Sequence, residues 1–113
     1  MRNDADRRFS LIVRARGHCE AGAFDGITCS PMLQCAHLVP RRYLSVRWDF
    51  GNAACLCSAH HAYLTHFPLA HQRFCAEFLG EREWEALKSR AELARGAPDY
   101  ESLLEHLKRM ALA

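Results

Sequence analysis

The chain has 113 residues, half of them apolar and a quarter charged, which is typical of one folded domain with a modest core. No apolar run approaches the roughly 18 residues of a membrane span, and no signal peptide is evident, so we expect a cytoplasmic protein with no membrane contact. Residues 1–50 carry eight Lys or Arg against five Asp or Glu, and residues 51–113 carry seven against eight. The excess positive charge of the first half suits a partner that bears phosphate groups.

The first predicted helix spans residues 3–16, NDADRRFSLIVRAR. Asn3 or Asp4 can cap its start, and Gly17 can end it. A turn-rich segment follows as far as Pro31. The helical spacing places one group of side chains on a common face: Phe9, Ile12, Val13 and the stem of Arg16.

Two short apolar segments, residues 32–39 and 52–57, are predicted to pair as antiparallel strands. The loop between them, PRRYLSVRWDFG, is long for a hairpin, and loops of that length are often functional. A knuckle at residues 57–60 is predicted to open a helix that runs to about His66. Three further helices are predicted over residues 68–79, 81–95 and 98–112. Pro68 starts the first of them, and Asp99 caps the third. One side of the second is lined by Trp84, Leu87, Ala91 and Ala94.

The six cysteines favour a metal site over three disulfides. Disulfide frameworks belong to secreted chains, and we expect no secretory signal here, since the first residues lack the apolar run of a signal peptide. Cys57 stands in a C-x-x-H motif with His60, and Cys35 stands two residues before His37. The sequence therefore predicts one α+β domain over residues 1–113 with metal ligands near its centre.

The stretch LQCAHLVPRRYLSVRWDFGNAACLCSAHHAYLTHFP contains His37, Asn52 and His61 in the order of an HNH motif. The chain resembles small phage- or prophage-type HNH endonucleases, and the likeness extends to about Glu92. The resemblance implies a ββα-metal (His-Me finger) core over residues 19–68, stapled by a zinc knuckle. Helices flank this core over residues 3–16 and 68–112.

The resemblance also implies roles for the motif residues. His37 would be the general base, since a neutral imidazole can take a proton from water near pH 7. Asn52 would fix the long loop near His37, and His61 would hold one catalytic Mg²⁺ or Mn²⁺. Many family members carry a second ligand, Asp or His, immediately before the base, where this chain has Ala36. That departure predicts weaker binding of the catalytic metal. It leaves a zinc-stapled nucleic-acid-binding module without catalysis as the alternative function. A zinc-stabilised protein-interaction domain is the third candidate function.

A structural zinc ion is expected at a Cys₃His site, because these donors suit tetrahedral Zn²⁺. The ligands would be Cys19, Cys29, Cys57 and His60, with Cys35 as the rival for the second position. Cys55 and Cys75 lie in apolar segments and are predicted to be core thiols.

Three arginines of the long loop, Arg41, Arg42 and Arg47, are predicted to clamp the phosphate backbone of DNA without reading its sequence. The expected function is therefore weakly specific, metal-dependent DNA hydrolysis that leaves 5′-phosphate and 3′-hydroxyl ends. The resemblance further suggests genome processing or packaging beside a phage terminase, in the cytoplasm of a bacterial host. The sequence leaves open whether the protein is a monomer or a homodimer.

Overall fold

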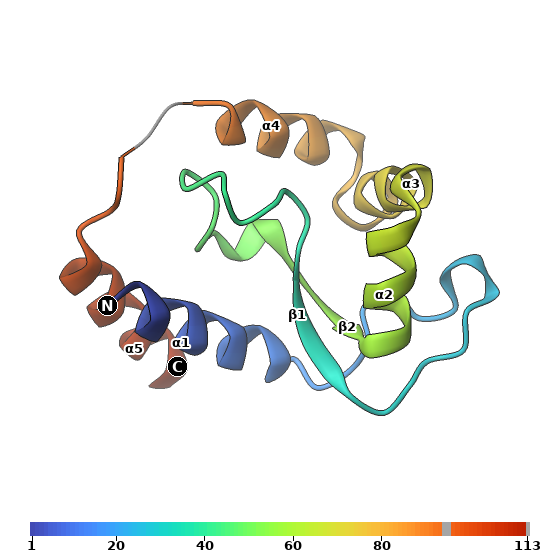
Figure 1. The fold of residues 1–113 in the computed structure, drawn as a ribbon, viewed down its shortest axis with the longest axis horizontal. Coiled ribbons are helices and arrows are strands. Elements are labelled where there is room, and N and C mark those ends of the chain that lie inside the picture. Colours follow the sequence, from blue (N-terminus) through green and yellow to red (C-terminus); the bar gives the residue numbers. More distant parts are fainter. Residues whose placement is uncertain (94–95, 113) are drawn as a thin grey trace.

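A two-stranded antiparallel sheet lies between two groups of helices (Figure 1). The computed structural model describes residues 1–93 and 96–112, the side chain of Leu112 excepted. Within these residues the fold is α+β, with five α-helices. The elements in chain order are α1 (Arg2–Arg14), β1 (Leu33–His37), β2 (Ala53–Cys57), α2 (Ser58–His66), α3 (Pro68–Leu79), α4 (Glu81–Ala91) and α5 (Tyr100–Leu112), with short 3₁₀ turns at Phe24–Gly26 and Phe50–Asn52.

The predicted hairpin and the helix from Pro68 to Leu79 are confirmed. The predicted cap of the first helix is wrong: α1 begins at Arg2 with Met1 as its N-cap, and no side chain caps it. Asp99 does cap α5, because its Oδ1 accepts the backbone N–H groups of Glu101 and Ser102. α4 ends at Ala91 rather than at residue 95, and Ala94, which was predicted to line that helix, lies outside the described residues.

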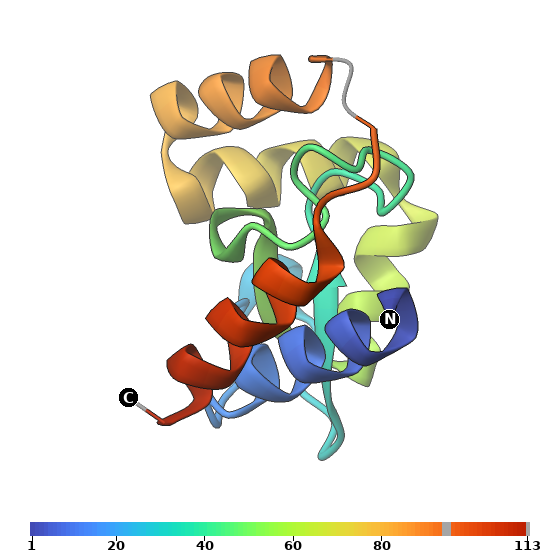
Figure 2. The same cartoon turned by 90° about the vertical axis from the view of Figure 1, so that its left-hand side faces the viewer.

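Every residue of β2 is buried, because helices cover both faces of the hairpin. Ala54 and Leu56 face a core built with α2, α3 and α4, while Ala53 and Cys55 face a second core built with α1 and α5. Figures 1 and 2 show α1 and α5 side by side on one side of the hairpin and α3 and α4 on the other. An alternating strand thus joins two small hydrophobic cores.

The long loop between the strands is anchored against α4. Val46 is fully buried in the core of α2, α3 and α4. The Ser45 hydroxyl reaches the end of α4, where it lies 2.9 Å from the carbonyl oxygen of Arg90. These contacts fix the backbone that follows His37. Among the described residues, no helix has the length and apolar character needed to cross a membrane.

Candidate metal cluster and active-site cavity

Three cysteines and one histidine meet at the start of α2. The ligand atoms of Cys19, Cys29, Cys57 and His60 all lie within 4.8 Å of one another. His60 Nδ1 is 3.6 Å from the sulfurs of Cys19 and Cys29 and 3.2 Å from that of Cys57. A tetrahedral zinc ion, with its usual bond lengths, separates sulfur and nitrogen ligands by about 3.5 Å. The predicted cluster can therefore hold a metal ion such as zinc, with Cys29 rather than Cys35 as its fourth member.

Contacts around the cluster hold its ligands in place. His60 is fully buried, and its Nε2 lies 3.3 Å from the carbonyl oxygen of Phe24. Donation of Nε2–H to that oxygen leaves the lone pair of Nδ1 facing the three sulfurs. Cys57 is the N-cap of α2, and its sulfur accepts the backbone N–H of His60. The backbone N–H of Glu20 donates to the Cys55 carbonyl at 2.7 Å, which holds the Cys19 segment beside β2.

The surroundings of the thiols also favour metal binding. Desolvation opposes ionisation of Cys57, but the backbone N–H groups of His60 and Ser30 outweigh it and lower the pKa of Cys57 to about 6. Desolvation and the neighbouring thiols of Cys19 and Cys57 raise the pKa of Cys29 to about 11. Thiolates crowded together in this way repel one another, and a bound cation would relieve that repulsion.

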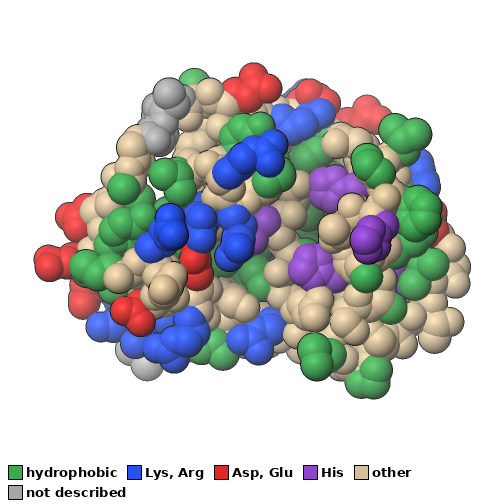
Figure 3. All heavy atoms as spheres, viewed as in Figure 1, with side chains coloured by type: hydrophobic (Ala, Val, Ile, Leu, Met, Phe, Trp, Pro, Cys, Tyr) green, Lys and Arg blue, Asp and Glu red, His purple; other side chains and the backbone are tan. Residues whose placement is uncertain are grey.

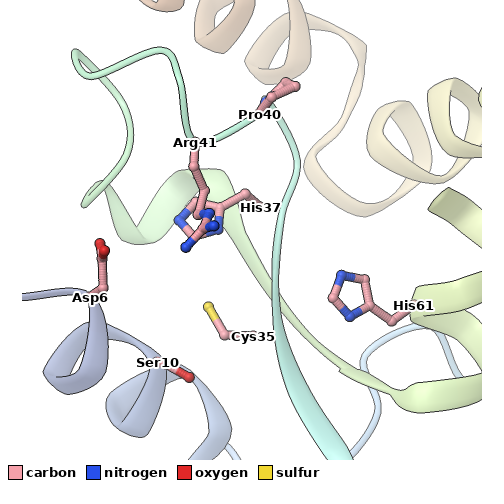
Figure 4. Close-up of a pocket in the computed structure, with 7 residues that line it drawn as sticks. All are labelled: Asp6, Ser10, Cys35, His37, Pro40, Arg41 and His61. Carbon is pink, nitrogen blue, oxygen red and sulfur yellow. The ribbon is translucent and has the colours of Figure 1, made fainter. Parts of the chain in front are cut away.

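A cavity of about 480 Å³ opens between α1, β1 and α2 (Figure 4). Its walls bring together three of the predicted site residues, His37, Arg41 and His61. The remaining lining residues are Asp6, Ser10, Cys35 and Pro40. Figure 3 shows Lys and Arg side chains over α1 and the loop after β1, with His side chains beside them toward α2 and α3.

The His37 ring is held as a neutral imidazole. Its Nε2 lies 2.8 Å from the carbonyl oxygen of Arg47, which accepts the Nε2–H and leaves an unprotonated Nδ1. The Phe9 ring stacks on the imidazole, with the ring centroids 5.6 Å apart. Burial lowers the pKa of His37, and the positive charges of Arg41 and Arg47 lower it further, against the raising effects of the Arg47 carbonyl and Asp6. The imidazole is therefore neutral at pH 7 and able to accept a proton.

Asn52 is fully buried in the short turn that precedes β2. Its Nδ2 donates to the carbonyl oxygens of Val39 and Val46, at 3.0 and 3.1 Å, and its Oδ1 accepts the backbone N–H of Val39 at 2.7 Å. One side chain thus bridges both ends of the loop that follows His37. The sequence predicted a positional role for Asn52, and these are the contacts that such a role would use.

His61 is oriented by a residue that sequence reasoning missed. Its Nδ1 lies 2.7 Å from Oε1 of Gln34 on β1, so Nδ1–H donates to that oxygen and Nε2 keeps its lone pair. Desolvation lowers the pKa of His61, so this imidazole is also neutral at pH 7. Ala36 is buried in the core and offers no ligand. Among the described residues, the Cys/His cluster is the only group of three or more Cys, His, Asp or Glu side chains positioned to share an ion, and His61 lies outside it.

The three arginines of the loop differ in their surroundings. Arg41 and Arg42 are exposed and form no ion pair within the described part of the chain. Arg47 is 9% exposed and turns inward, where its Nε and Nη2 donate to the two carboxylate oxygens of Asp6 at 3.0 and 2.6 Å. The structure therefore places Arg47 in an internal ion pair rather than in the predicted phosphate clamp, since Asp6 already neutralises its charge.

The Asp6–Arg47 pair should make stability sensitive to acid. Burial opposes ionisation of Asp6, but hydrogen bonds and charge from Arg47, with help from the Trp48 indole, lower its pKa below the usual 3.8. The contribution of the pair to the free energy of unfolding is then fully present above about pH 4. It is lost as the pH falls through the pKa of Asp6 in the folded protein. Asp6→Asn should lower the free energy of unfolding by about 2 kcal/mol at pH 7, because Arg47 loses its counterion.

Urea unfolding of the wild type and of Asp6→Asn between pH 7 and pH 2.5 measures this difference. Asp4→Asn, an exposed position on the same helix, is the matched control and should track the wild type. The difference in free energy of unfolding between the wild type and Asp6→Asn should shrink below pH 4. A deficit that stays constant with pH would show that ionisation of Asp6 does not stabilise the fold.

No family model, no curated protein and no solved structure matches this chain. The side chains provide a Cys₃His cluster that could hold a metal ion such as zinc. Beside it lies a cavity that holds two neutral, oriented imidazoles and the exposed guanidinium of Arg41.

Proposed function

We propose that this chain is a metal-dependent DNA endonuclease of the HNH kind that its sequence resembles. In this proposal β1, β2 and α2 form a ββα-metal core, and a structural zinc ion at the Cys/His cluster staples it. The main support is that His37 and His61 line one cavity while backbone and side-chain acceptors fix the tautomer of each ring. An imidazole held neutral in an accessible cavity is suited to proton transfer rather than to structural support.

In the proposed reaction, unprotonated Nδ1 of His37 takes a proton from water. The resulting hydroxide attacks the phosphorus of a phosphodiester, the bond from phosphorus to the 3′ oxygen breaks, and the leaving oxygen takes a proton from water. The products are a 5′-phosphate and a 3′-hydroxyl. Asn52 positions the base in this scheme, because its three hydrogen bonds fix the loop whose Arg47 carbonyl orients His37.

Nε2 of His61 would hold the catalytic cation, which when bound would stabilise the negative charge that develops on the phosphate and on the leaving oxygen. A single imidazole with no second ligand from Ala36 is a weak site for Mg²⁺, which prefers oxygen ligands, and suits Mn²⁺ better. Water and phosphate oxygens would have to fill the other coordination positions. We therefore expect higher activity in manganese than in magnesium.

Arg41 and Arg42 provide the proposed contact with the DNA backbone. Both are exposed; Arg41 lines the cavity, and Arg42 is the next residue in the chain. Guanidinium groups bind phosphate through paired N–H donors without reading bases, so we propose low sequence specificity. The resemblance to phage proteins suggests a place in phage genome processing, with a terminase as the partner.

Nicking of supercoiled plasmid in excess EDTA, Mg²⁺ or Mn²⁺ tests the proposal. The wild type should nick in Mn²⁺, more slowly in Mg²⁺ and not in EDTA. His61→Ala should nick at least about 100-fold more slowly, because the cation loses its protein ligand. His66→Ala, an exposed histidine on the same helix, should match the wild type.

Ala36 favours a second candidate, the zinc-stapled nucleic-acid-binding module without catalysis. This candidate predicts a salt-sensitive complex with DNA in a gel-shift assay and no nicking with either metal. Failure to nick and to bind would reject both candidates and leave a protein-interaction domain.

A further inference from the structure

Cys35 and Cys55 face each other across the hairpin. They are partners in the antiparallel register of β1 and β2. Side chains of directly opposed residues point to the same face of a sheet. All six cysteines of the chain are free thiols, and these two lie outside the Cys/His cluster.

The backbone hydrogen bonds show which kind of pair they form. Both backbone groups of Cys55 bond to Glu20 on the other edge of β2: its N–H donates to Glu20 Oε1 at 2.8 Å, and its carbonyl accepts the Glu20 N–H at 2.7 Å. The backbone hydrogen bonds between β1 and β2 therefore join every second pair of opposed residues, the pairs that alternate with Cys35 and Cys55. At the end of the hairpin, Leu38 N–H donates to the Asn52 carbonyl in the same register. Cys35 and Cys55 are therefore a non-hydrogen-bonded pair, the class with the shorter Cα separation of about 4.5 Å. A disulfide tolerates Cα separations from about 4.4 to 6.8 Å, so the backbone need not move far.

The two thiols differ in access to solvent. Cys35 lines the open cavity beside His37 and His61 (Figure 4). Cys55 is fully buried beneath it, in the core formed with α1 and α5. An oxidant that enters the cavity can thus reach the Cys35 thiol, while the Cys55 thiol lies opposite Cys35 in the buried core. This is the arrangement of an attacked cysteine and a resolving cysteine.

We propose that Cys35 and Cys55 are a redox-active pair that a hydroperoxide converts to a cross-strand disulfide. The Cys35 sulfur takes one oxygen from hydrogen peroxide, which gives a sulfenic acid and releases water. The Cys55 sulfur then attacks the Cys35 sulfur, the S–O bond breaks, and the oxygen leaves as a second water after taking the Cys55 proton. Two thiols are oxidised by two electrons, and the peroxide is reduced to two waters. The reaction needs only the hairpin and the open cavity, so it does not depend on nuclease activity.

The disulfide would change the cavity. It would draw the Cys35 sulfur away from the wall that it shares with His37 and toward the core. It would also join the two strands covalently, two residues from His37. The thiols of the Cys/His cluster meet at the start of α2, and a zinc ion bound there would keep them from taking part in this disulfide.

The test treats the zinc-loaded, full-length protein with hydrogen peroxide, and then counts free thiols by alkylation under denaturing conditions and intact-mass analysis. The wild type should lose two of its six alkylatable thiols and recover them with dithiothreitol. Desolvation raises the pKa of Cys35 to about 11, so the protonated thiol should react slowly, and the reaction is followed over hours. Zinc content, measured in parallel, should stay constant.

Matched variants locate the bond. Cys35→Ser, at a partly exposed position, should abolish the paired loss of thiols, and Cys55→Ala should do the same. Cys75→Ala removes a buried thiol on α3 and should still lose two thiols. Loss of two thiols that persists in Cys35→Ser, or release of zinc in step with thiol loss, would overturn the proposal and place the oxidation in the Cys/His cluster. Six thiols retained in the wild type would overturn it as well.

Discussion

Cys57→Ala is expected to leave the chain unfolded at room temperature. Cys57 is a member of the Cys/His cluster, its sulfur caps α2, and its strand is buried on both faces. Binding of zinc to structural sites contributes about 10–16 kcal/mol, whereas a domain of this kind has a total stability of about 5–15 kcal/mol. Loss of the ion would therefore remove most or all of the net stability.

Thermal unfolding followed by circular dichroism, together with zinc analysis of the purified protein, measures this effect. Cys75→Ala is the matched control, because it makes the same substitution at a fully buried thiol outside the cluster. Truncation of one sulfur in a core costs about 1 kcal/mol, so the control should melt a few degrees below the wild type and keep its zinc. If Cys57→Ala melts as the control does, the cluster has no structural metal.

The local elements of this fold could be predicted from the sequence. Pro68 and Gly80 bound α3 as expected, and short apolar segments identified both strands. The Cys/His cluster was also predictable, because the ligand types and the C-x-x-H spacing favour a metal site however far apart the residues lie in the chain. His60 and Cys57 could be assigned from spacing alone, while Cys29 had to be chosen over Cys35 by strand alternation.

The long-range polar contacts could not be predicted. Arg47 looked like a free loop cation because its partner, Asp6, lies on α1, 41 residues earlier in the chain. Gln34 carries no motif, yet it orients His61, because the hairpin brings it beside α2. Such pairs depend on how elements pack in three dimensions, and the periodicity of a single element holds no information about them. Helical spacing predicted that Phe9 shares one face with Ile12 and Val13, but its stacking on His37 depends on the same packing.

His37→Ala is expected to have the largest effect on cleavage. Removal of a general base costs about 100- to 10,000-fold in rate. Zinc content and melting temperature should remain close to those of the wild type, because His37 lies outside the Cys/His cluster and is only partly buried. Rates of plasmid nicking in Mn²⁺, together with zinc analysis and a thermal melt on the same samples, test both statements. Loss of zinc from His37→Ala would show that the cluster and the cavity are not separate sites.

If His37 is the general base, two further results are expected that a structural role would not produce. Imidazole added to the buffer should restore part of the activity of His37→Ala, because the cavity left by the side chain opens to solvent. The rate of the wild type should fall in acid with a midpoint below the usual histidine value of about 6.5, since burial and the nearby arginines lower the pKa of His37. A structural histidine would yield neither rescue by imidazole nor an acid limb shifted in this direction. Nicking by His37→Ala at the wild-type rate would exclude His37 as the general base, and another group that lines the cavity would have to take that role.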